Sequence, residues 1–336
     1  MKRANKIIFI IPDSKKHGAQ NFFSRLHNNF LTDDSQKELI IEDEYTKLCL
    51  FFYILRISLY KKVIIFSTVN SNVTTLALKL MNPFIIIIPR LGNTISQELE
   101  KNTIKFFVHK FFYYLLIRIS KFFIFQSNDM KKDFINFFGI SSPNYTVINN
   151  GLTFPSSQFK NALPNEELKC LLVGTFKKQK GYDIFLESLP YIKNIDKVKF
   201  DICGDGPLLN EFKQKLSLTS FNSLISFHGF INPRPFYKEA NIYLLPSIFE
   251  GFSNSLIEAL SYGLPCIASD CPGANKDVIK ENFNGYLFIN RNPIDLAEKI
   301  DLLINNIKSF SSINIYEDAK SKYNIEHIAT QYKNLL

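Results

Sequence analysis

The chain has 336 residues, enough for two domains of ordinary size, and its 46% apolar and 21% charged residues exclude a disordered chain. The formal net charge is +9, and all of the excess lies in residues 1–150, because residues 151–336 hold equal numbers of acidic and basic side chains. A basic half of this kind could serve nucleic acid, an anionic membrane surface or a phosphorylated acceptor.

No stretch approaches the roughly 20 uninterrupted apolar residues of a membrane-spanning helix. The N-terminus lacks the pattern of a secretory signal. The five cysteines have neither metal-finger nor redox spacing, so buried thiols are expected rather than a disulfide framework. We therefore expect a protein that is made and kept in the cytoplasm and that binds no metal.

The first half of the chain alternates short apolar runs with longer mixed segments. This alternation favours a parallel sheet wrapped by helices. The strands are expected near residues 6–11, 62–66, 84–88, 121–126 and 145–148. Gly18 follows the first strand and opens a helix, where free backbone N–H groups could bind a phosphate; a plain helix start is the alternative.

Residues 101–125 contain no acidic side chain, and their cations interleave with Phe, Tyr and Ile. This composition is typical of segments that bind membrane interfaces. On a helical wheel, however, the cations do not gather on one face, which favours a core helix with a few solvated lysines. The last residues of the segment favour a strand. Leu48 to Lys62 is a second segment of the same kind.

The segment from Phe154 to Glu167 is polar, holds two prolines and shows no periodicity, so we place the interdomain linker there. The second half then repeats the alternation of strands and helices. Its strands are expected near residues 169–174, 198–203, 223–227, 242–245 and 265–268. The tail, roughly 315–336, predicts one helix with apolar residues at helical spacing.

Residues 246–263 combine a strand end, a turn at Gly251 and a short helix. Glu250 is then expected at the mouth of the strand and Glu258 in the helix, at the edge of a parallel sheet where ligands bind. Two carboxylates there can accept hydrogen bonds from the hydroxyls of a polyhydroxyl ligand. The alternative for Glu258 is a capping box with Ser255, three residues earlier.

Lys180 stands at the start of a predicted helix, after the first strand of the second half. A cation at that position, together with the free N–H groups of the helix, would suit a pyrophosphate; a solvated lysine is the alternative. The stretch Gly204-Asp205-Gly206-Pro207 is interpreted as a turn, because Gly and Pro satisfy turn geometry without a ligand.

Taken in order, these turns resemble those of glycosyltransferase family 4, which comprises retaining enzymes of the GT-B fold. The resemblance is strongest from Val173 to Phe288, and the ordered series is far more specific than any single turn. The segments that carry it are Val173-Gly174, Gln179-Lys180-Gly181, Gly204-Asp205-Gly206-Pro207, Phe227-His228-Gly229-Phe230, Pro246-Ser247, Glu250-Gly251-Phe252, Glu258-Ala259-Leu260, Gly263-Leu264-Pro265 and Pro272-Gly273. The first half matches more loosely, through Gly18-Ala19, Ser127 and Asn150-Gly151.

The resemblance implies an α/β protein with two Rossmann-like domains that face each other across a cleft. Residues 1–155 would form the acceptor domain and residues 156–315 the domain that binds the nucleotide sugar. Residues 316–336 would form a C-terminal helix that packs back towards the N-terminal domain.

The resemblance also implies roles for individual residues. Glu250 would hold hydroxyls of the transferred sugar and Lys180 would neutralise the diphosphate, which makes these two the expected catalytic residues. Glu258 would hold the ribose hydroxyls, and Gly18 would let an N-terminal loop close over the donor. The full set of expected substrate-binding residues is Gly18, Gly174, Thr175, Lys178, Gly251, Phe252, Ser253, Asn254, Glu258 and Arg90.

The sequence departs from the family at two positions. Thr175 stands where the family usually has Arg, so that Lys177 or Lys178 would have to reach the diphosphate instead. Arg90 or Asn93 stands where the family often has a His near the sugar. The family needs no metal, because a cation and helix ends can stabilise the leaving diphosphate.

The function implied is transfer of a sugar from a nucleotide sugar, expected to be a UDP-sugar, to a polyprenyl-diphosphate-linked or other lipid-linked glycan of O-antigen or capsule. The basic, Phe-rich N-terminal domain would then contact the anionic inner face of the cytoplasmic membrane as a peripheral enzyme. The alternatives are an epimerase-like enzyme that modifies sugar nucleotides and a non-catalytic protein that binds them. A nucleic-acid partner is not expected, because aromatic-basic β-platform and helix-turn-helix signals are missing.

Overall fold

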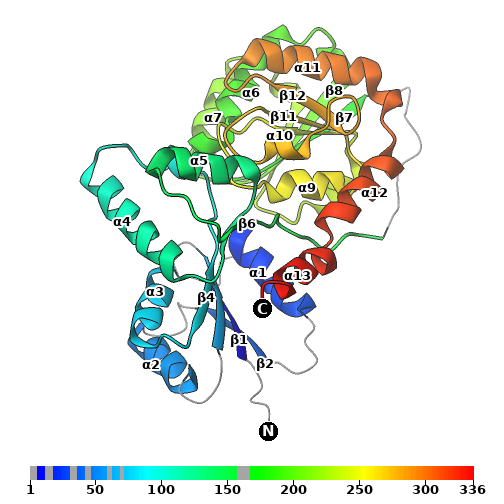
Figure 1. The fold of residues 1–336 in the computed structure, drawn as a ribbon. Helices are drawn as coiled ribbons and strands as arrows, with labels where there is room; N and C mark the ends of the chain where they lie inside the picture. Colours follow the sequence, from blue (N-terminus) through cyan, green and yellow to red (C-terminus); the bar gives the residue numbers. More distant parts are fainter. Residues whose placement is uncertain are drawn as a thin grey trace. The chain divides into compact units, whose positions relative to one another are not determined.

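The computed structural model describes residues 6–11, 18–30, 36–41, 47–58, 63–68, 72–156 and 167–336 (Figure 1). The chain divides into two compact units: unit 1 comprises Met1–Thr153 and Tyr323–Leu336, and unit 2 comprises Phe154–Lys322. The sequence placed these boundaries after residues 155 and 315.

Unit 1 is built on parallel strands in the order β2-β1-β3-β4. A further parallel pair, β5-β6, adjoins the end of β4, where the Leu91 N–H donates to the Ile124 carbonyl over 2.9 Å. The strands are β1 (Lys6–Ile11), β2 (Gln36–Ile41), β3 (Val63–Ser67), β4 (Ile86–Pro89), β5 (Phe123–Phe125) and β6 (Tyr145–Val147). All except β2 were predicted; the sequence of β2 begins with Gln, Lys and Glu, so that its apolar run is short.

Both faces of the unit 1 sheet are covered by helices. Side chains of β1 alternate between two apolar clusters: Ile8 and Ile10 point into one, and Ile7 and Phe9 into the other. A strand that is buried on both faces has to be apolar throughout, as β1 is. The helices of this unit are α1 (Gly18–Asn29), α2 (Lys47–Ser58), α3 (Asn72–Met81), α4 (Ile104–Ile119), α5 (Asn128–Phe138) and α13 (Ile325–Lys333).

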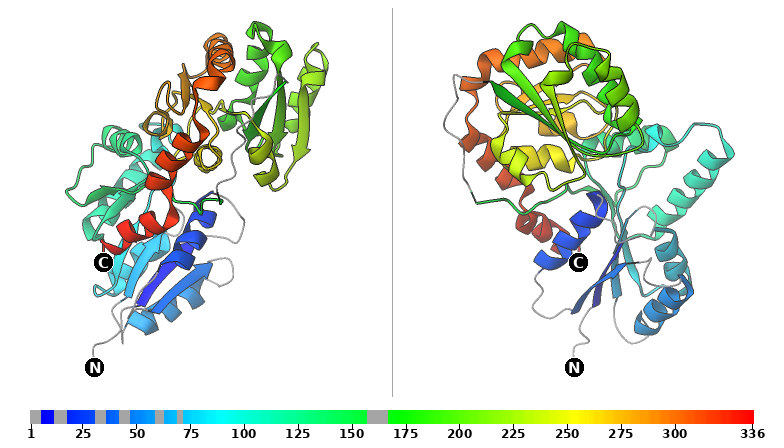
Figure 2. Two further views of the ribbon diagram at one scale, coloured as in Figure 1. Left: turned by 90° about the vertical axis from the view of Figure 1, so that its right-hand side faces the viewer. Right: turned by 180° about the vertical axis from the view of Figure 1, so that it is seen from behind.

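The tail is not the single helix that the sequence predicted. It breaks at Asn324, which has an extended backbone (φ −62°, ψ 132°) and caps α13 by accepting from the Glu326 N–H. The break arises because Leu152 pairs with the chain on both sides of Asn324, accepting from the Ile325 N–H and donating to the Tyr323 carbonyl. Helix α12 (Ser312–Tyr323) therefore belongs to unit 2 up to Lys322, whereas α13 packs beside α1 in unit 1 (Figures 1 and 2).

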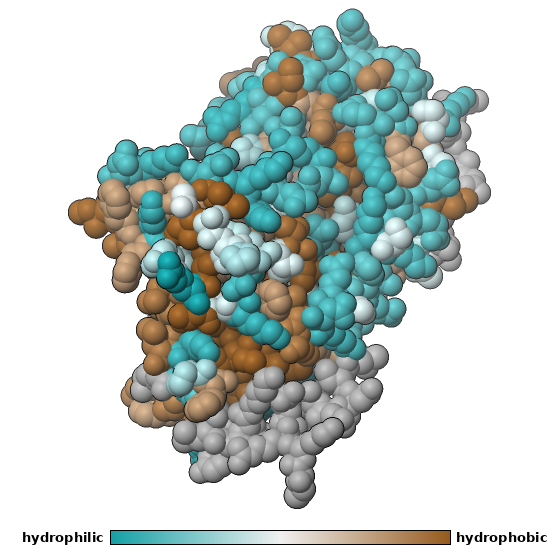
Figure 3. Space-filling model, in the orientation of Figure 1, coloured by the Kyte–Doolittle hydropathy of each residue, from teal (hydrophilic) through white to brown (hydrophobic). Residues whose placement is uncertain are grey.

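Helix α4 is not the core helix that the sequence favoured. One face is buried through Phe106, Tyr113, Leu116 and Ile117. The other face exposes large apolar side chains, which are Ile104, Phe107, Val108, Phe111 and Tyr114. Figure 3 shows hydrophobic residues gathered on this side of unit 1.

Unit 2 contains one parallel sheet in the order β12-β11-β10-β7-β8-β9. Its strands are β7 (Leu168–Val173), β8 (Val198–Cys203), β9 (Ile225–Gly229), β10 (Ile242–Leu245), β11 (Cys266–Ser269) and β12 (Gly285–Phe288). Strand β12 was not predicted, because its first residue, Gly285, follows Asn284, and Asn-Gly is a turn signal. The helices are α6 (Tyr182–Ser188), α7 (Leu209–Ser217), α8 (Arg234–Glu239), α9 (Asn254–Leu260), α10 (Asn275–Val278), α11 (Pro293–Asn306) and α12.

The strand order of unit 2 creates a switch point. From β7 the chain builds outward through β8 and β9, then returns to β10 on the other side of β7 and continues to β11 and β12. Helices α6 and α11 lie on one side of the sheet and α9 on the other (Figures 1 and 2). In open parallel sheets, ligands bind at the carboxyl ends of the two strands where the order reverses, which here are β7 and β10.

Candidate active site

An ion pair joins the segments that follow the two strands of the switch point. Lys180 lies in a 3-10 turn (Lys178–Lys180) after β7, and Glu250 lies in the loop after β10. The Lys180 ammonium donates to Glu250 Oε1 over 2.6 Å, and the Ser247 hydroxyl donates to the same oxygen over 2.6 Å. The Glu250 side chain is 7% exposed and the Lys180 side chain 21%, so the pair is largely shielded from water on the carboxylate side.

The backbone of the Glu250 loop is fixed by the turns on either side of it. The Gln179 side-chain amide donates to the Phe249 carbonyl over 3.0 Å. The backbone carbonyl of Gln179 accepts from the Ile248 N–H over 2.8 Å. On the other side, the Glu250 N–H donates to the Pro272 carbonyl over 2.9 Å. The carboxylate is therefore presented by a loop that is hydrogen-bonded to the segments after β7 and β11.

Two glycines allow these turns to approach one another closely. Gly181 has φ +62°, and a Cβ built there would lie 2.0 Å from the Pro246 carbonyl oxygen. Gly273 has φ +133°, and its Cβ would lie 2.1 Å from the Glu250 carbonyl oxygen. Any larger residue would push the Glu250 loop away from its neighbours, so both positions require Gly.

The Cys271 thiol near the pair carries no charge. Burial raises the pKa of the Cys271 thiol to about 12, and the Glu250 carboxylate adds to the rise, so this thiol is protonated at neutral pH. Among the described residues, no group of three His, Cys, Asp or Glu side chains could hold a metal ion. At this site the Lys180 ammonium supplies positive charge within hydrogen-bond distance of the acid.

Glu258 lies on α9 and is half-buried. The N-cap residue of α9 is Ser253, whose side chain makes no capping hydrogen bond, and Ser255 is already the second residue of the helix. The alternative for Glu258, a capping box with Ser255, is therefore wrong. The hydroxyl of the buried Tyr237 donates to the Ser255 carbonyl over 3.1 Å and lies 3.5 Å from Glu258 Oε2. Tyr237 thus fixes the first turn of α9 and the carboxylate that projects from it.

The other predicted residues of unit 2 lie on the same two loops. Gly174 follows β7 directly, and a Cβ built there would lie 3.5 Å from the Lys180 Cδ atom; the Gly174 carbonyl accepts from the Tyr182 hydroxyl. Thr175 and Lys178 are exposed in the same turn, as is Lys177. The residues after Glu250 form the entry to α9: Gly251, Phe252 and Ser253 are buried and Asn254 is partly buried.

Two predicted residues belong to unit 1. Gly18 is the first residue of α1, as predicted. Arg90 follows β4 and is only 1% exposed; its guanidinium donates to the Asn150 side chain and stacks 4.4 Å from the centre of the Phe22 ring. Its Nε and Nη1 have no hydrogen-bond partner among the described residues. In this structure Arg90 is thus a buried contact between β4, α1 and Asn150, and a substrate contact for it stays a prediction.

Three residues at the site received no role from the sequence: Ser247, Gln179 and Gly273. Ser247 holds the Glu250 carboxylate, Gln179 holds the loop backbone, and Gly273 makes room for it. All three lie in segments that carry the family resemblance, and the three-residue spacing from Ser247 to Glu250 was a further signal. The contacts of Gln179 and Gly273 depend on the neighbouring positions of β7, β10 and β11, which local sequence does not reveal.

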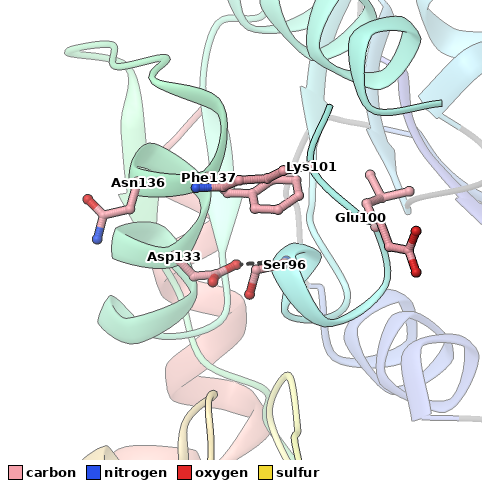
Figure 4. Close-up of a pocket in the computed structure, with 7 residues that line it drawn as sticks. Ser96, Glu100, Lys101, Asp133, Asn136 and Phe137 are labelled. Atoms are coloured by element: carbon pink, nitrogen blue, oxygen red, sulfur yellow. Dashed lines mark hydrogen bonds between the residues drawn. The ribbon is translucent and has the colours of Figure 1, made fainter. Parts of the chain in front are cut away.

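Unit 1 carries a separate pocket of about 500 Å³. Figure 4 shows it between residues 96–101, which precede α4, and helix α5, with the Asp133 carboxylate accepting from the Ser96 N–H over 3.1 Å. The lining residues are Ser96, Leu99, Glu100, Lys101, Asp133, Asn136 and Phe137. Carboxylate, amide and ammonium groups beside an aromatic ring are suited to a polar ligand with an apolar face.

Residues 153–319 match the family model described as glycosyl transferases group 1. The GalNAc-α-(1→4)-GalNAc-α-(1→3)-diNAcBac-PP-undecaprenol α-1,4-N-acetyl-D-galactosaminyltransferase of Campylobacter jejuni is 30% identical over 184 residues, 53% of this chain and 50% of that protein. The UDP-Gal:α-D-GlcNAc-diphosphoundecaprenol α-1,3-galactosyltransferase of Escherichia coli is 34% identical over 129 residues, 37% of this chain and 33% of that protein. The chain spans about half the length of the first curated relatives that it matches.

Solved structures match the whole chain at low identity. HepE of Anabaena in complex with UDP aligns with a TM-score of 0.79 and 16% identity over 98% of each chain. The lipopolysaccharide outer core galactosyltransferase WaaB aligns with a TM-score of 0.77, also at 16% identity over 98% of each chain. The predicted α/β architecture of the GT-B fold, with two Rossmann-like units, is therefore confirmed.

Gly181→Ala is expected to lose more stability than Gly229→Ala, although φ is similar at the two glycines, +62° and +70°. Each alanine meets the left-handed backbone penalty of about 1–2 kcal/mol. A Cβ at Gly229 meets nothing within 4 Å, whereas one at Gly181 meets the Pro246 carbonyl. Urea denaturation of the two variants measures the difference; equal losses would show that the turns do not constrain each other.

Proposed function

We propose that this chain is a retaining glycosyltransferase that moves a sugar from a nucleotide-sugar donor, a UDP-sugar in the simplest case, to a lipid-linked glycan. The observation that carries the proposal is the Lys180–Glu250 pair at 2.6 Å, positioned at the switch point of a parallel sheet. The match of residues 153–319 to glycosyl transferases group 1 places that pair inside the matched stretch.

The donor would bind at the carboxyl edge of the unit 2 sheet. Lys180 has three donor hydrogens, so its bond to Glu250 leaves it able to bind a diphosphate as well. Glu250, held by Ser247, would accept hydrogen bonds from hydroxyls of the transferred sugar. Glu258 would accept from the ribose hydroxyls, because it projects from the neighbouring helix α9.

In the reaction, the bond between the anomeric carbon and the diphosphate oxygen breaks, and the acceptor oxygen forms a new bond to that carbon. The proton of the acceptor hydroxyl passes to the departing diphosphate oxygen. Attack on the face that the diphosphate leaves would retain the anomeric configuration. The negative charge that develops on the diphosphate is greatest in the transition state. The Lys180 ammonium, positioned before the donor arrives, would stabilise that charge without reorganisation.

The acceptor would bind to unit 1 and carry a lipid anchor, as in polysaccharides such as O-antigen or capsule. Two similar enzymes, from Campylobacter jejuni and Escherichia coli, are named for undecaprenol-linked acceptors, which supports this choice. The basic excess of residues 1–150 would suit a diphosphate-linked substrate at the inner face of the cytoplasmic membrane. The pocket beside Phe137 is our candidate for part of the glycan site.

Glu250→Ala is expected to abolish transfer while the fold survives, and Glu250→Gln is expected to behave alike, because a neutral amide cannot balance Lys180. A loss of at least about 100-fold in turnover is typical when a preorganised charged group is removed. Transfer of labelled sugar to extracted lipid-linked glycans, with circular dichroism as the folding check, measures the effect. Product analysis also separates transfer from the rearrangement expected of an epimerase-like enzyme.

The matched control is Glu239→Gln, which removes a carboxylate from another Lys–Glu pair of unit 2. The Lys169–Glu239 pair spans 2.8 Å, but its side chains are 47% and 57% exposed. Turnover of this variant should be unchanged. Wild-type turnover in Glu250→Gln would contradict the proposed role of the carboxylate.

Glu258→Ala is expected to weaken binding of the nucleotide, by about 1–3 kcal/mol for lost charged hydrogen bonds. Its control is Glu211→Ala, since Glu211 forms an exposed pair with Lys215 on α7. Calorimetric titration with UDP and UDP-sugars measures both variants. Equal affinity for wild type and Glu258→Ala would leave the carboxylate with a structural role only.

Chelation of divalent metal with EDTA is expected to leave transfer unchanged, because Lys180 provides the positive charge beside the diphosphate in our proposal. The test is turnover after dialysis against EDTA, with and without added Mg²⁺ or Mn²⁺. A loss that either metal restores would mean that a metal ion shares the role assigned to Lys180.

A further inference from the structure

Helix α4 carries large apolar side chains on two faces, but only one of these faces is buried against the rest of unit 1. The exposed face follows helical spacing over nearly the whole length of α4. Its side chains are Ile104 (85% exposed), Phe107 (58%), Val108 (59%), Phe111 (69%) and Tyr114 (43%). A contiguous stripe of large exposed apolar side chains is typical of a surface that binds a partner, so we expect one to cover the stripe.

The stripe continues onto the two neighbouring helices. Helix α3 contacts both α2 and α4. Leu48 and Phe52 of α2 are 65% and 57% exposed, and Val73 and Leu80 of α3 are 61% and 59% exposed. Figure 3 shows a broad hydrophobic area on this side of unit 1. We call the exposed residues of α2, α3 and α4 the α2–α4 surface.

The exposed residues of the α2–α4 surface include cations but no acidic side chain. The Glu38 carboxylate of β2 borders the surface, where it accepts from the Tyr53 hydroxyl of α2 and pairs with Lys6. None of the three helices contains an Asp or a Glu. Arg56, Lys105 and Arg118 are exposed on them, and the Arg118 guanidinium lies 4.7 Å from the centre of the Tyr114 ring. The nearest acids before α4, Glu98 and Glu100, lie in the preceding turn.

We propose that the α2–α4 surface docks onto an anionic membrane, with α4 lying in the plane of the interface. Phe107, Phe111 and Ile104 would enter the boundary between headgroups and acyl chains, and the cations would contact acidic headgroups. The helix does not cross the bilayer: α4 has 16 residues, and no helix of the described residues has the length and hydropathy needed to span it.

A second copy of the chain fits this surface less well than lipid does. A symmetric contact would bring Lys105 and Arg118 towards the same residues of the other copy, and α2, α3 and α4 provide no carboxylate to pair with them. An anionic lipid surface complements both properties of the patch, because it offers hydrocarbon to the stripe and phosphate to the cations. The inference deepens the proposed function by naming the surface that meets the membrane, and it rests on that function only for the identity of the acceptor.

Co-sedimentation with vesicles of phosphatidylcholine, with and without phosphatidylglycerol, tests the proposal. The full chain should bind the anionic vesicles at low salt and bind them less as salt screens the cations. The double variant Phe107→Ser/Phe111→Ser should weaken partitioning about 100-fold, roughly tenfold for each ring withdrawn from the interface. The matched control is Leu218→Ser, because Leu218 is 88% exposed on unit 2 and should not contribute.

A probe on Cys49 gives a second readout. Cys49 lies on α2 and is exposed, whereas Cys170, Cys203, Cys266 and Cys271 are buried. Burial raises the pKa of each of these four thiols, so that a maleimide dye should label Cys49 selectively at neutral pH. An environment-sensitive dye there should shift to the blue with anionic vesicles, and the shift should be lost in Phe107→Ser/Phe111→Ser.

Several outcomes would overturn the proposal: equal binding to neutral and anionic vesicles, no binding to either, or undiminished binding by the double variant. Light scattering tests whether a second copy of the chain binds the stripe instead. A dimer in the wild type that becomes a monomer in Phe107→Ser/Phe111→Ser would assign the stripe to that second copy. The melting-temperature rise caused by UDP, measured without vesicles, should be the same in the double variant. If vesicles bind but no sugar is transferred, the proposed function fails while the docking surface stands.

Discussion

The candidate site depends on the close approach of three backbone turns at the carboxyl ends of β7, β10 and β11. Gly181 and Gly273 press against the Pro246 and Glu250 carbonyls from opposite sides, and neither position leaves room for a Cβ. The loop between them cannot move without disturbing both neighbours. This constraint determines where the Glu250 carboxylate lies, and only because β7 and β10 are adjacent in the sheet does Lys180 reach it.

A largely buried ion pair of this kind adds little to the free energy of unfolding, because both charges have to be removed from water. Removing a carboxylate from water costs several kcal/mol, which a single ammonium offsets only in good geometry. Here the geometry is supported by Ser247, by the Gln179 hydrogen bonds and by two glycines, all directed at one acid. Several residues that together fix one buried carboxylate at a ligand-binding crevice are more typical of a binding site than of a structural salt bridge.

Strand positions could be predicted because buried parallel strands are continuous apolar runs, and the two missed strands show the limit of that signal. The sequence of β2 begins with polar residues, and β12 begins at a Gly that equally suits a turn. Lys180 and Glu250 were identified one at a time from local motifs. Their contact spans 70 residues and follows from the strand order, which periodicity does not encode. The same holds for the break at Asn324, which Leu152 imposes from a distant part of the chain.

In unit 1, the positions of the charged and apolar side chains, rather than their numbers, determine what the surface can bind. A net charge of +9 attracts any anion, but screening confines its effect to about 10 Å at 0.1 M salt, so that the cations beside an apolar face decide what that face can bind. The helical wheel of residues 101–125 showed no separate cationic face, and this argued for burial. The structure resolves the ambiguity differently: α4 uses one apolar face for the core of unit 1 and keeps a second for a partner, with Lys105 and Arg118 exposed along it. An absent cationic stripe therefore does not argue against an interfacial helix when the helix is apolar on both faces.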